Sequence, residues 1–557
     1  MSLSVFYLCW CRRLSGCVVL LAALVGGCAS PPGSVDVSTS IDRVAVARDV
    51  AAHLNFLASD DMGGRETGTL EGQITAHYVA AALHAAGLDP GGDDGSYLQR
   101  YPLESSSLDE ENARFILRGG GEEHVFDFRE DFQLRRGSGD MQVTAPLVYA
   151  GYGITAPDQE WDDLKGLPVE GKVVVVLDGH PEGRNDLASP GQWWTKSRTL
   201  EERGAAGLII ALTKDDDRAR GTLEALDRRS RSGRLHLPTT EESQAFPFVY
   251  LTSLAADDFF RAAGTDLAKE VDRAEAGSPG PLPIDDMSME LVAPHNKEVF
   301  FAMNACGLLE GSDPDLRDEV IVLSAHMDHV GRDEDGAIYN GADDNASGTT
   351  TLLSLARSMA ARGAPRRSVL FLLVSGEEKG LLGSAWWVRQ PTLDLSRVVA
   401  NVNIDMVGRN ASDVIGATPS PDHPDYNTLV TRAAALAPPY GLDVVWDVGP
   451  SEDTLERVDS YFHRSDHANF SAAGIPVVFF FSGVHEDYHQ PTDTVEKINQ
   501  EKLVRLVGFL ERFVTDVGNR SEPPQRIGST EEGLGRRIGP ALLDLAQSRS
   551  ILPRPLL

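Results

Sequence analysis

The chain has few cysteines and no long apolar run near its start, and both absences narrow the classes of protein to consider. Five of its 557 residues are cysteine, and four of them lie within the first 28 positions. Only Cys306 lies in the rest of the chain, so we expect no disulfide within the body of the protein. The apolar run over 17–25 is too short to span a bilayer comfortably.

Basic residues are also scarce. Lys and Arg number 51 against 83 Asp and Glu, which gives a formal net charge of −32. Because the phosphate backbone of nucleic acids selects Lys and Arg, we expect no nucleic-acid partner. The chain is too long for one ordinary domain, so two or three are expected.

The first residues are typical of a bacterial export signal. Arg12-Arg13 precedes the apolar run, which has the length of a signal-peptide core. Val25-Gly26-Gly27-Cys28 then resembles a lipobox, in which the cysteine becomes the lipidated first residue. We therefore predict a signal peptide over 1–27 and an exported lipoprotein of the cell envelope (periplasmic or outer membrane), whose only membrane contact is a lipid anchor at Cys28. The alternative is simple secretion after cleavage at a nearby small residue.

The remainder of the chain alternates predicted helices and strands. Helical spacing of apolar residues begins near Ile41, and short β-branched runs follow from about Met141. After Glu298, strands and helices alternate regularly, which predicts an α/β three-layer sandwich with a mostly parallel central sheet and an inserted β-rich α+β domain. The predicted boundaries are a tether over 28–40, the N-terminal part of the α/β domain over 41–139, the insert over 140–292, the main part over 293–515, and a tail over 516–557 in which 534–548 could form a short amphipathic helix.

Five segments in the second half of the chain carry side chains that bind metals. Three of them follow predicted strands, and the carboxyl ends of parallel strands meet at one edge of an open α/β sheet. We therefore expect these side chains to converge there. The segments are Ala325-His326-Met327-Asp328, Gly341-Ala342-Asp343-Asp344-Asn345, Ser375-Gly376-Glu377-Glu378, Asn403-Ile404-Asp405-Met406 and Asp487-Tyr488-His489-Gln490.

This set supplies the donors that two neighbouring divalent ions need. His326 and His489 would each give one imidazole nitrogen to one ion, and Glu378 and Asp405 would complete one ion each. One carboxylate of the Asp343-Asp344 pair would bridge both ions, which would lie about 3.5–4 Å apart. Spacing alone does not separate the two aspartates. Zinc accepts such a mixture of nitrogen and oxygen donors.

Two carboxylates remain for other roles. Asp328 is placed to orient the His326 imidazole rather than to bind metal. Glu377 can take a proton from the metal-activated water and pass it to the leaving amine. For the other histidines near these motifs we expect structural or surface roles: His329, His463, His467 and His485. Ser465-Asp466-His467 is discounted as a nucleophile triad because triad partners normally come from distant segments.

Together the motifs resemble the co-catalytic zinc exopeptidases, which include bacterial leucyl aminopeptidases and, more distantly, glutamate carboxypeptidase and the transferrin receptor. The resemblance covers roughly residues 41–515. It implies two Zn²⁺ per chain, one held by His326, Asp344 and Asp405, the other by Asp344, Glu378 and His489. It also selects Asp344 as the bridging ligand and places Glu377 at the general-base position. The insert resembles a protease-associated domain through Trp161-Asp162-Asp163-Leu164, Gly171-Lys172-Val173-Val174 and Gly204-Ala205-Ala206-Gly207.

The resemblance implies an exported zinc aminopeptidase that hydrolyses N-terminal residues from peptide substrates. A carboxypeptidase, or a glutaminyl cyclase with one ion, is an alternative on the same fold. A non-catalytic receptor-like binding protein would be expected to lack ligands, and this sequence retains them all. The oligomeric state is left open.

Overall fold

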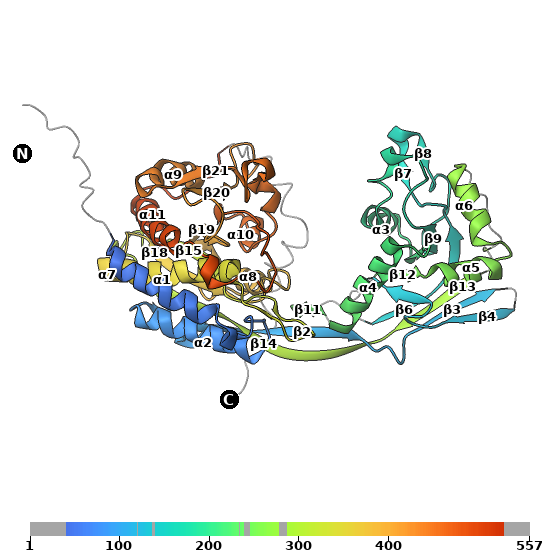
Figure 1. Ribbon diagram of the computed structural model, residues 1–557, viewed down its shortest axis with the longest axis horizontal. Coiled ribbons are helices and arrows are strands. Elements are labelled where there is room, and N and C mark those ends of the chain that lie inside the picture. Colours follow the sequence, from blue (N-terminus) through green and yellow to red (C-terminus); the bar gives the residue numbers. More distant parts are fainter. Residues whose placement is uncertain are drawn as a thin grey trace, which may run out of the picture. The chain divides into compact units, whose positions relative to one another are not determined.

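The computed structural model describes residues 41–119, 121–135, 140–232, 234–238, 246–277, 284 and 287–527 (Figure 1). The predicted signal peptide, the tether, Cys28 and the tail helix at 534–548 lie outside the described residues. Among the helices described, none is both long and apolar enough to cross a bilayer.

A ten-stranded mixed sheet carries three of the five polar segments at the ends of its strands. Its strand order is β11-β2-β14-β18-β15-β19-β24-β20-β21, with β1 paired to β14. The four central strands run parallel: β18 (Ser368–Val374), β15 (Val320–His326), β19 (Val398–Ile404) and β24 (Val477–Phe481). The outer strands are β1 (Asp89–Pro90), β2 (Leu98–Leu108), β11 (Arg234–His236), β14 (His295–Leu309), β20 (Val414–Thr418) and β21 (Asp443–Val445). The α/β architecture is confirmed. The parallel direction holds in the centre of the sheet, whereas β14 and β20 pair antiparallel to its two outermost parallel strands.

Helices cover both faces of this sheet. Every residue of β15 and β18 is buried, as expected for strands with a layer on each side. On one face, Val320 and Val322 pack in a cluster with Trp387 and Phe470, which come from α8 (Leu382–Arg389) and α10 (His467–Ala472). On the other face, Ile321 lies next to Gly518 of α11 (Gln500–Asn519). That layer also contains α1 (Arg43–Leu57) and α7 (Gly348–Arg362), which both pack on α11.

The first two helices follow the predicted pattern. In α1, Val46, Val50, Leu54 and Leu57 are buried at helical spacing, and the Asp42 side chain accepts hydrogen bonds from the first turn. The helix α2 (Leu70–Ala85) begins after Thr69, whose hydroxyl accepts from the Gly72 N–H at 3.2 Å. The segment between these helices, 58–69, has little regular structure, and it passes beside the polar edge of the sheet.

The chain leaves the first sheet through β2 and returns through β14, and the residues between them include a second, eight-stranded sheet with its own helices. Its order is β4-β3-β13-β6-β9-β10-β12-β5. The strands are β3 (Arg114–Gly119), β4 (Glu122–Phe126), β5 (Phe132–Leu134), β6 (Met141–Tyr149), β9 (Val173–Leu177), β10 (Gly207–Ala211), β12 (Phe248–Leu251) and β13 (Ser288–Ala293). Because β3, β4 and β5 lie before residue 140 yet pair in this sheet, we propose that the inserted domain begins soon after β2. Its likeness to a protease-associated domain stays a prediction.

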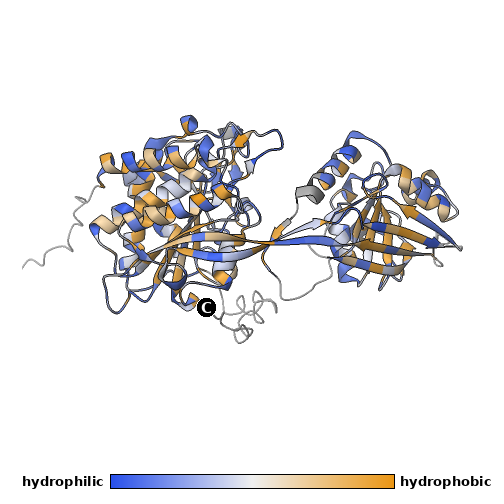
Figure 2. Cartoon of the chain, turned by 90° about the horizontal axis from the view of Figure 1, so that it is seen from below, coloured by the Kyte–Doolittle hydropathy of each residue, from blue (hydrophilic) through white to orange (hydrophobic). Residues whose placement is uncertain are grey.

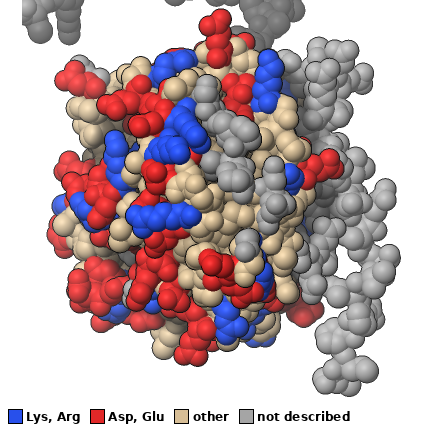
Figure 3. All heavy atoms as spheres, turned by 90° about the vertical axis from the view of Figure 1, so that its right-hand side faces the viewer, with Lys and Arg blue, Asp and Glu red and all other residues tan. Residues whose placement is uncertain are grey.

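The second sheet has an apolar core on each face. One core gathers Val173 and Val175 with Phe259 and Phe260 of α5 (Ser253–Ala262). The other gathers Val174 and Val176 with Leu200 of α3 (Trp193–Glu202). Figure 2 shows hydrophobic residues concentrated along the strands, while the helices carry both kinds of residue. The face drawn in Figure 3 displays many Asp and Glu side chains with Lys and Arg interspersed, as the acidic composition predicts.

Candidate metal centre

The five polar segments meet at the carboxyl edge of the parallel strands, as predicted. His326 is the last residue of β15, and Asp405 directly follows β19. Glu378 lies four residues beyond the end of β18, at Val374. The two remaining contributors come from loops: Asp344 from the turn Ala342–Ser347 that precedes α7, and His489 from the segment that follows β24.

His326, Asp344 and Asp405 form one buried group. The Nε2 of His326 lies 3.2 Å from Asp405 Oδ1 and 3.3 Å from Asp344 Oδ1. The other ring nitrogen, Nδ1, lies 3.1 Å from the carbonyl oxygen of Asp328. Because a carbonyl only accepts, Nδ1 carries a hydrogen in this contact, and Nε2 is the nitrogen that faces the carboxylates and could bind a metal. This is the arrangement that a metal-binding imidazole needs.

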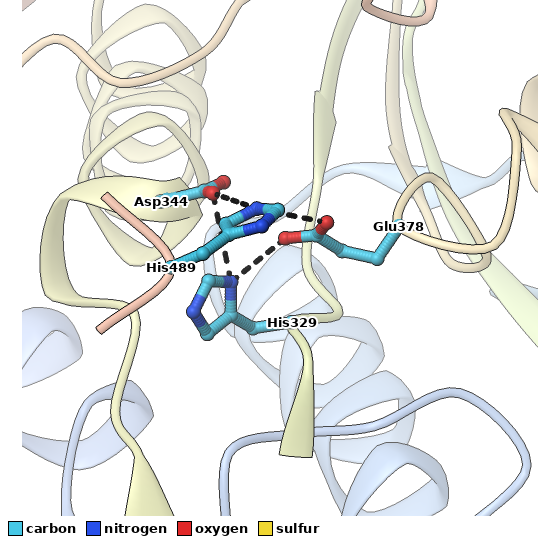
Figure 4. Close-up of side chains that lie close together, drawn as sticks. All are labelled: His329, Asp344, Glu378 and His489. Atoms are coloured by element: carbon cyan, nitrogen blue, oxygen red, sulfur yellow. Dashed lines mark hydrogen bonds and ion pairs between the residues drawn. The ribbon is translucent and has the colours of Figure 1, made fainter. Parts of the chain in front are cut away.

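A second group lies on the other side of Asp344. The Nε2 of His489 lies 3.1 Å from Asp344 Oδ2 and 3.1 Å from Glu378 Oε2 (Figure 4). His329 also points into this group: its Nδ1 is 2.8 Å from Glu378 Oε1 and 3.7 Å from Asp344 Oδ2. The sequence analysis gave His329 only a structural or surface role. Its position three residues after His326, on the same loop beyond β15, was the signal that could have pointed to it.

Asp344 joins the two groups because each of its oxygens faces a different histidine. Oδ1 faces His326 and Oδ2 faces His489. Within each group the ligand atoms lie within 4.8 Å of one another, close enough to surround one ion. The donors are imidazole nitrogens and carboxylate oxygens, the mixture that zinc accepts. The residues therefore fit a pair of metal ions with Asp344 between them.

The pKa values of the two histidines reflect the many carboxylates around them. Burial acts to lower the pKa of His326, but Asp405, Glu377 and Asp344 together raise that pKa well above its usual value. Burial acts likewise on His489, yet its hydrogen bonds to Asp344 and Glu378 raise the pKa to about 10. So many buried carboxylates need positive charge beside them, whether from protons or from metal ions.

The pKa values of Asp344 and Asp405 are shifted in opposite directions. Burial alone would raise the pKa of Asp344, but the neighbouring histidines 329, 326 and 489 hold it well below its usual value. Burial raises the pKa of Asp405, against the opposing effect of His326. The bridging position is therefore the more strongly anionic of the two, which suits a carboxylate shared by two cations.

Glu377 lies beside the two groups, close enough to His326 and Glu378 to form a further group with them, and it lines a cavity. It is nearly buried, and burial together with the carboxylates of Glu378, Asp466 and Asp405 raises its pKa well above its usual value despite His326. The cavity has a volume of about 60 Å³. Its wall combines the polar side chains of the centre, Ser465 and Arg464 with six apolar or aromatic residues: Met406, Tyr461, Phe479, Phe481, Val484 and Tyr488.

Asp328 holds several parts of the centre together. Its carboxylate oxygen Oδ1 lies 3.7 Å from His326 Nδ1 and accepts from the Glu377 N–H at 3.3 Å. Its Oδ2 accepts from the Thr67 hydroxyl at 2.9 Å. The closest contact that Asp328 makes with the imidazole is thus through its carbonyl oxygen, while its carboxylate links two neighbouring segments.

Ser465, Asp466 and His467 point to different partners. The Ser465 hydroxyl donates to Asp405 Oδ2 at 2.8 Å, and Asp466 accepts from Ser384 at 2.5 Å. The His467 ring stacks on Phe479, with ring centres 4.4 Å apart. No proton relay connects these three side chains, so they do not act as a nucleophile triad.

Comparison with known proteins gives a consistent result. Residues 304–513 match the family model described as "Peptidase family M28". A "Probable leucine aminopeptidase" of Arthroderma otae is 29% identical over 211 residues, covering 35% of this chain and 54% of that protein. The chain thus spans about half the length of the curated relatives it matches first. The "Probable lipoprotein aminopeptidase LpqL" of Mycobacterium tuberculosis is 24% identical over 528 residues, which cover 87% of this chain and 89% of that protein.

The chain is also similar to proteins whose structures have been solved. One is described as "Aminopeptidase from Aneurinibacillus sp. strain AM-1"; it is 20% identical, has a TM-score of 0.48, and matches over 86% of this chain and 95% of its own. A zinc aminopeptidase from Bacillus subtilis is 19% identical with a TM-score of 0.45, over 86% of this chain and 96% of its own.

Proposed function

We propose that the chain is a two-zinc aminopeptidase that removes apolar N-terminal residues from peptides, with residues 304–513, which match the model of peptidase family M28, as its catalytic part. The observation that carries the proposal is the position of Asp344, whose two oxygens face two different histidines. Relatives named as aminopeptidases support the choice of reaction.

The proposed ligands follow from the two groups of side chains. His326, Asp344 and Asp405 would hold one ion, and Asp344, Glu378 and His489 would hold the other. When bound, zinc would supply Lewis acidity toward the scissile carbonyl and the attacking water. Buried within the wall of the centre, Asp328 would keep the His326 ring in place through its carbonyl oxygen.

Glu377 is the proposed general base and acid. It is the carboxylate that lines the cavity without a place in the two ligand sets. Its environment raises its pKa well above the ordinary value, which suits a group that must take a proton from water and return it to the leaving amine. The proton would therefore move between the water, a Glu377 oxygen and the amine nitrogen.

The cavity wall supports a preference for apolar N-terminal side chains. Phe479, Phe481 and Tyr461 belong to one apolar cluster, and Val484 packs against it. A Leu, Met or Phe side chain would be removed from water against these residues.

The test is an assay of aminoacyl chromogenic substrates combined with zinc analysis. We expect two zinc ions per chain, hydrolysis of leucyl and phenylalanyl substrates, loss of activity with a chelator, and recovery when zinc is added. N-acetylated versions of the same substrates serve as the control and should not be cleaved. One zinc per chain with cyclisation of N-terminal glutamine would favour a glutaminyl cyclase, and cleavage only of C-terminal residues would favour a carboxypeptidase.

We also propose that the protein is a lipoprotein of the cell envelope. The lipobox-like Val25-Gly26-Gly27-Cys28 supports this location, as does the relative named as a lipoprotein aminopeptidase. Labelled fatty acid should be incorporated into the full chain and not into the Cys28→Ser variant. Cys17→Ser, which changes a cysteine within the predicted signal peptide, is the matched control and should keep the label.

A further inference from the structure

We propose that the segment Gly64-Arg65-Glu66-Thr67, which lies far from the M28 domain in sequence, is a positioning element of the metal centre. Arg65 would fix the two loops that carry His326 and Asp344, and Thr67 would fix the loop that carries Glu377. This inference rests on the proposed function, because it assigns these residues to the zinc site.

Arg65 connects the ligand loops through their main chains. Its guanidinium is 1% exposed, and four hydrogen bonds from it end on carbonyl oxygens. Nε donates to Met327 at 3.0 Å, next to His326, and Nη2 donates to Gly341 at 2.9 Å, at the start of the turn that carries Asp344. Nη1 donates to Asn340 at 2.6 Å and to Leu57 of α1 at 2.5 Å. One planar group therefore sets the distance between the two loops.

The charge of Arg65 suits this position. Burial lowers its pKa to about 10, while the carboxylates of Asp344, Asp493, Asp328 and Glu378 act to raise it. The side chain therefore remains a cation at neutral pH. It offsets part of the negative charge of the ligands while its donors stay on carbonyl oxygens, so the ligand oxygens remain available to metal.

Thr67 connects the segment to the general-base loop. Its hydroxyl donates to Asp328 Oδ2 at 2.9 Å and accepts from the Gly376 N–H at 2.8 Å. Gly376 directly precedes Glu377, whose own N–H donates to the other oxygen of Asp328. Thr67 and Asp328 thus hold both backbone amides at the start of the loop.

The backbone of the segment is fitted closely against the His326 loop. Gly64 accepts a hydrogen bond from the Gly331 N–H at 3.2 Å, and a Cβ on Gly64 would lie 2.2 Å from the Gly331 oxygen. Arg65 has a φ of +53°, a left-handed conformation that is uncommon for a residue with a side chain. Glu66 forms an isolated β-bridge with His329. Its carboxylate also forms an ion pair at 2.6 Å with Lys379, the residue that follows Glu378. The left-handed conformation of Arg65 is uncommon and persists only where neighbouring contacts hold it, as is frequent at functional sites.

The first experiment measures zinc affinity in the full chain. Arg65→Lys keeps the charge but removes the planar fork, and we expect the dissociation constant for zinc, measured by competition with a chromophoric chelator, to rise about 10- to 100-fold. Arg357→Lys is the matched control, because Arg357 is an exposed arginine paired with Asp49 at 2.6 Å; its zinc affinity should not change. Near-UV circular dichroism establishes that both variants are folded.

The second experiment compares two substitutions of similar size at Thr67. Thr67→Val removes the hydroxyl and Thr67→Ser keeps it. In Thr67→Val we expect kcat to fall about 10- to 100-fold with little change in KM, and the Gly376 amide of the zinc-free protein to exchange its hydrogen faster. Thr67→Ser should match the parent chain in both measurements.

These outcomes separate the two proposals. If the parent chain binds no zinc or cleaves no aminoacyl substrate, the proposed function fails. If the parent chain does both, and Arg65→Lys binds zinc with the parent affinity while Thr67→Val keeps the parent kcat and amide exchange, the positioning role is overturned. Should Arg65→Lys fail to fold, the Thr67 pair decides the question by itself.

Discussion

His485 and Asp343 form a buried pair, in which His485 Nε2 lies 3.2 Å from Asp343 Oδ2. The other oxygen of Asp343 accepts from the Gly408 N–H at 2.6 Å. Asp343 is thus bound to groups outside the metal centre, whereas Asp344 directs both oxygens at histidines of that centre. Two consecutive aspartates therefore have separate tasks, because the turn 342–347 points their side chains in different directions.

The two aspartates should respond differently to the same substitution. Asp344→Asn replaces the carboxylate whose two oxygens face His326 and His489, so we expect the variant to bind less than two zinc ions per chain and to lose activity by several orders of magnitude. Asp343→Asn should keep two zinc ions, since its oxygens contact His485 and Gly408. Zinc content after dialysis and the initial rate on a leucyl substrate measure the two effects.

Asp343→Asn is also the control, because it makes the same chemical change one position away. If the zinc content of Asp343→Asn stays at two, Asp343 is not the bridging ligand. The opposite pattern, with zinc lost in Asp343→Asn and retained in Asp344→Asn, would show that the bridging ligand has been assigned to the wrong residue.

Glu377→Gln should separate metal binding from turnover. The amide has the shape of the carboxylate but cannot accept the proton from the attacking water. We expect zinc content to remain at two per chain and kcat to fall by a factor of about 10² to 10⁴, the usual contribution of a general base. Inductively coupled plasma analysis and initial-rate kinetics check this, and a variant with full activity would remove Glu377 from the mechanism.

Much of this centre could be predicted because its ligands follow parallel strands. The β-branched and apolar runs of β15, β18 and β19 identify buried strands, and strand ends in an α/β sheet converge. His326, Glu378 and Asp405 therefore come together as expected. His489 was predicted as a ligand because two ions need two imidazoles, whereas the choice of Asp344 over Asp343 depended on the family resemblance.

Other features could not be predicted because they depend on contacts between distant segments. Arg65 lies 276 residues before Gly341, whose carbonyl it binds, and its sequence context is only a polar loop. His329 looked like one more histidine near a motif, and its approach to Glu378 depends on how the loop after β15 folds back. Likewise, the outer strands β2 and β14 pair antiparallel through eleven residue pairs that lie on either side of the inserted domain.

Substitution of Val484 should change the size of side chain that the cavity accepts. Val484 is half-buried in the cavity wall, and Val484→Trp would fill part of the cavity, whose volume is about 60 Å³. We expect kcat/KM for leucyl and phenylalanyl substrates to fall about 10- to 200-fold relative to the alanyl substrate. Val44→Trp is the control, because Val44 is 62% exposed on α1; an unchanged ratio in Val484→Trp would place the substrate side chain elsewhere.

Lys196 gives the inserted domain a stability that depends on pH. Its ammonium group is buried in α3 and donates to the carbonyl oxygens of Leu177 at 3.0 Å and Gly179 at 2.7 Å. Burial lowers its pKa from 10.5 to about 8, although Asp178 and Asp163 act to raise it. Between these two values the unfolded chain binds the proton and the folded chain releases it.

The sign of the effect follows from that difference in proton binding. Below pH 8 the Lys196 side chain is charged in both the folded and the unfolded state, so the full cost of burying the ammonium is present. As the pH rises from 8 to 10.5, the folded state loses this charge first, and the free energy of unfolding increases. Lys196→Met has no such proton, so the free energy of unfolding of the parent chain should gain about 2 kcal/mol relative to this variant between pH 7 and pH 10. Urea unfolding of the two proteins at both pH values measures the gain, and other titrating groups cancel in the difference. A difference that does not change with pH, or that falls as the pH rises, would mean that Lys196 keeps an ordinary pKa in the folded domain.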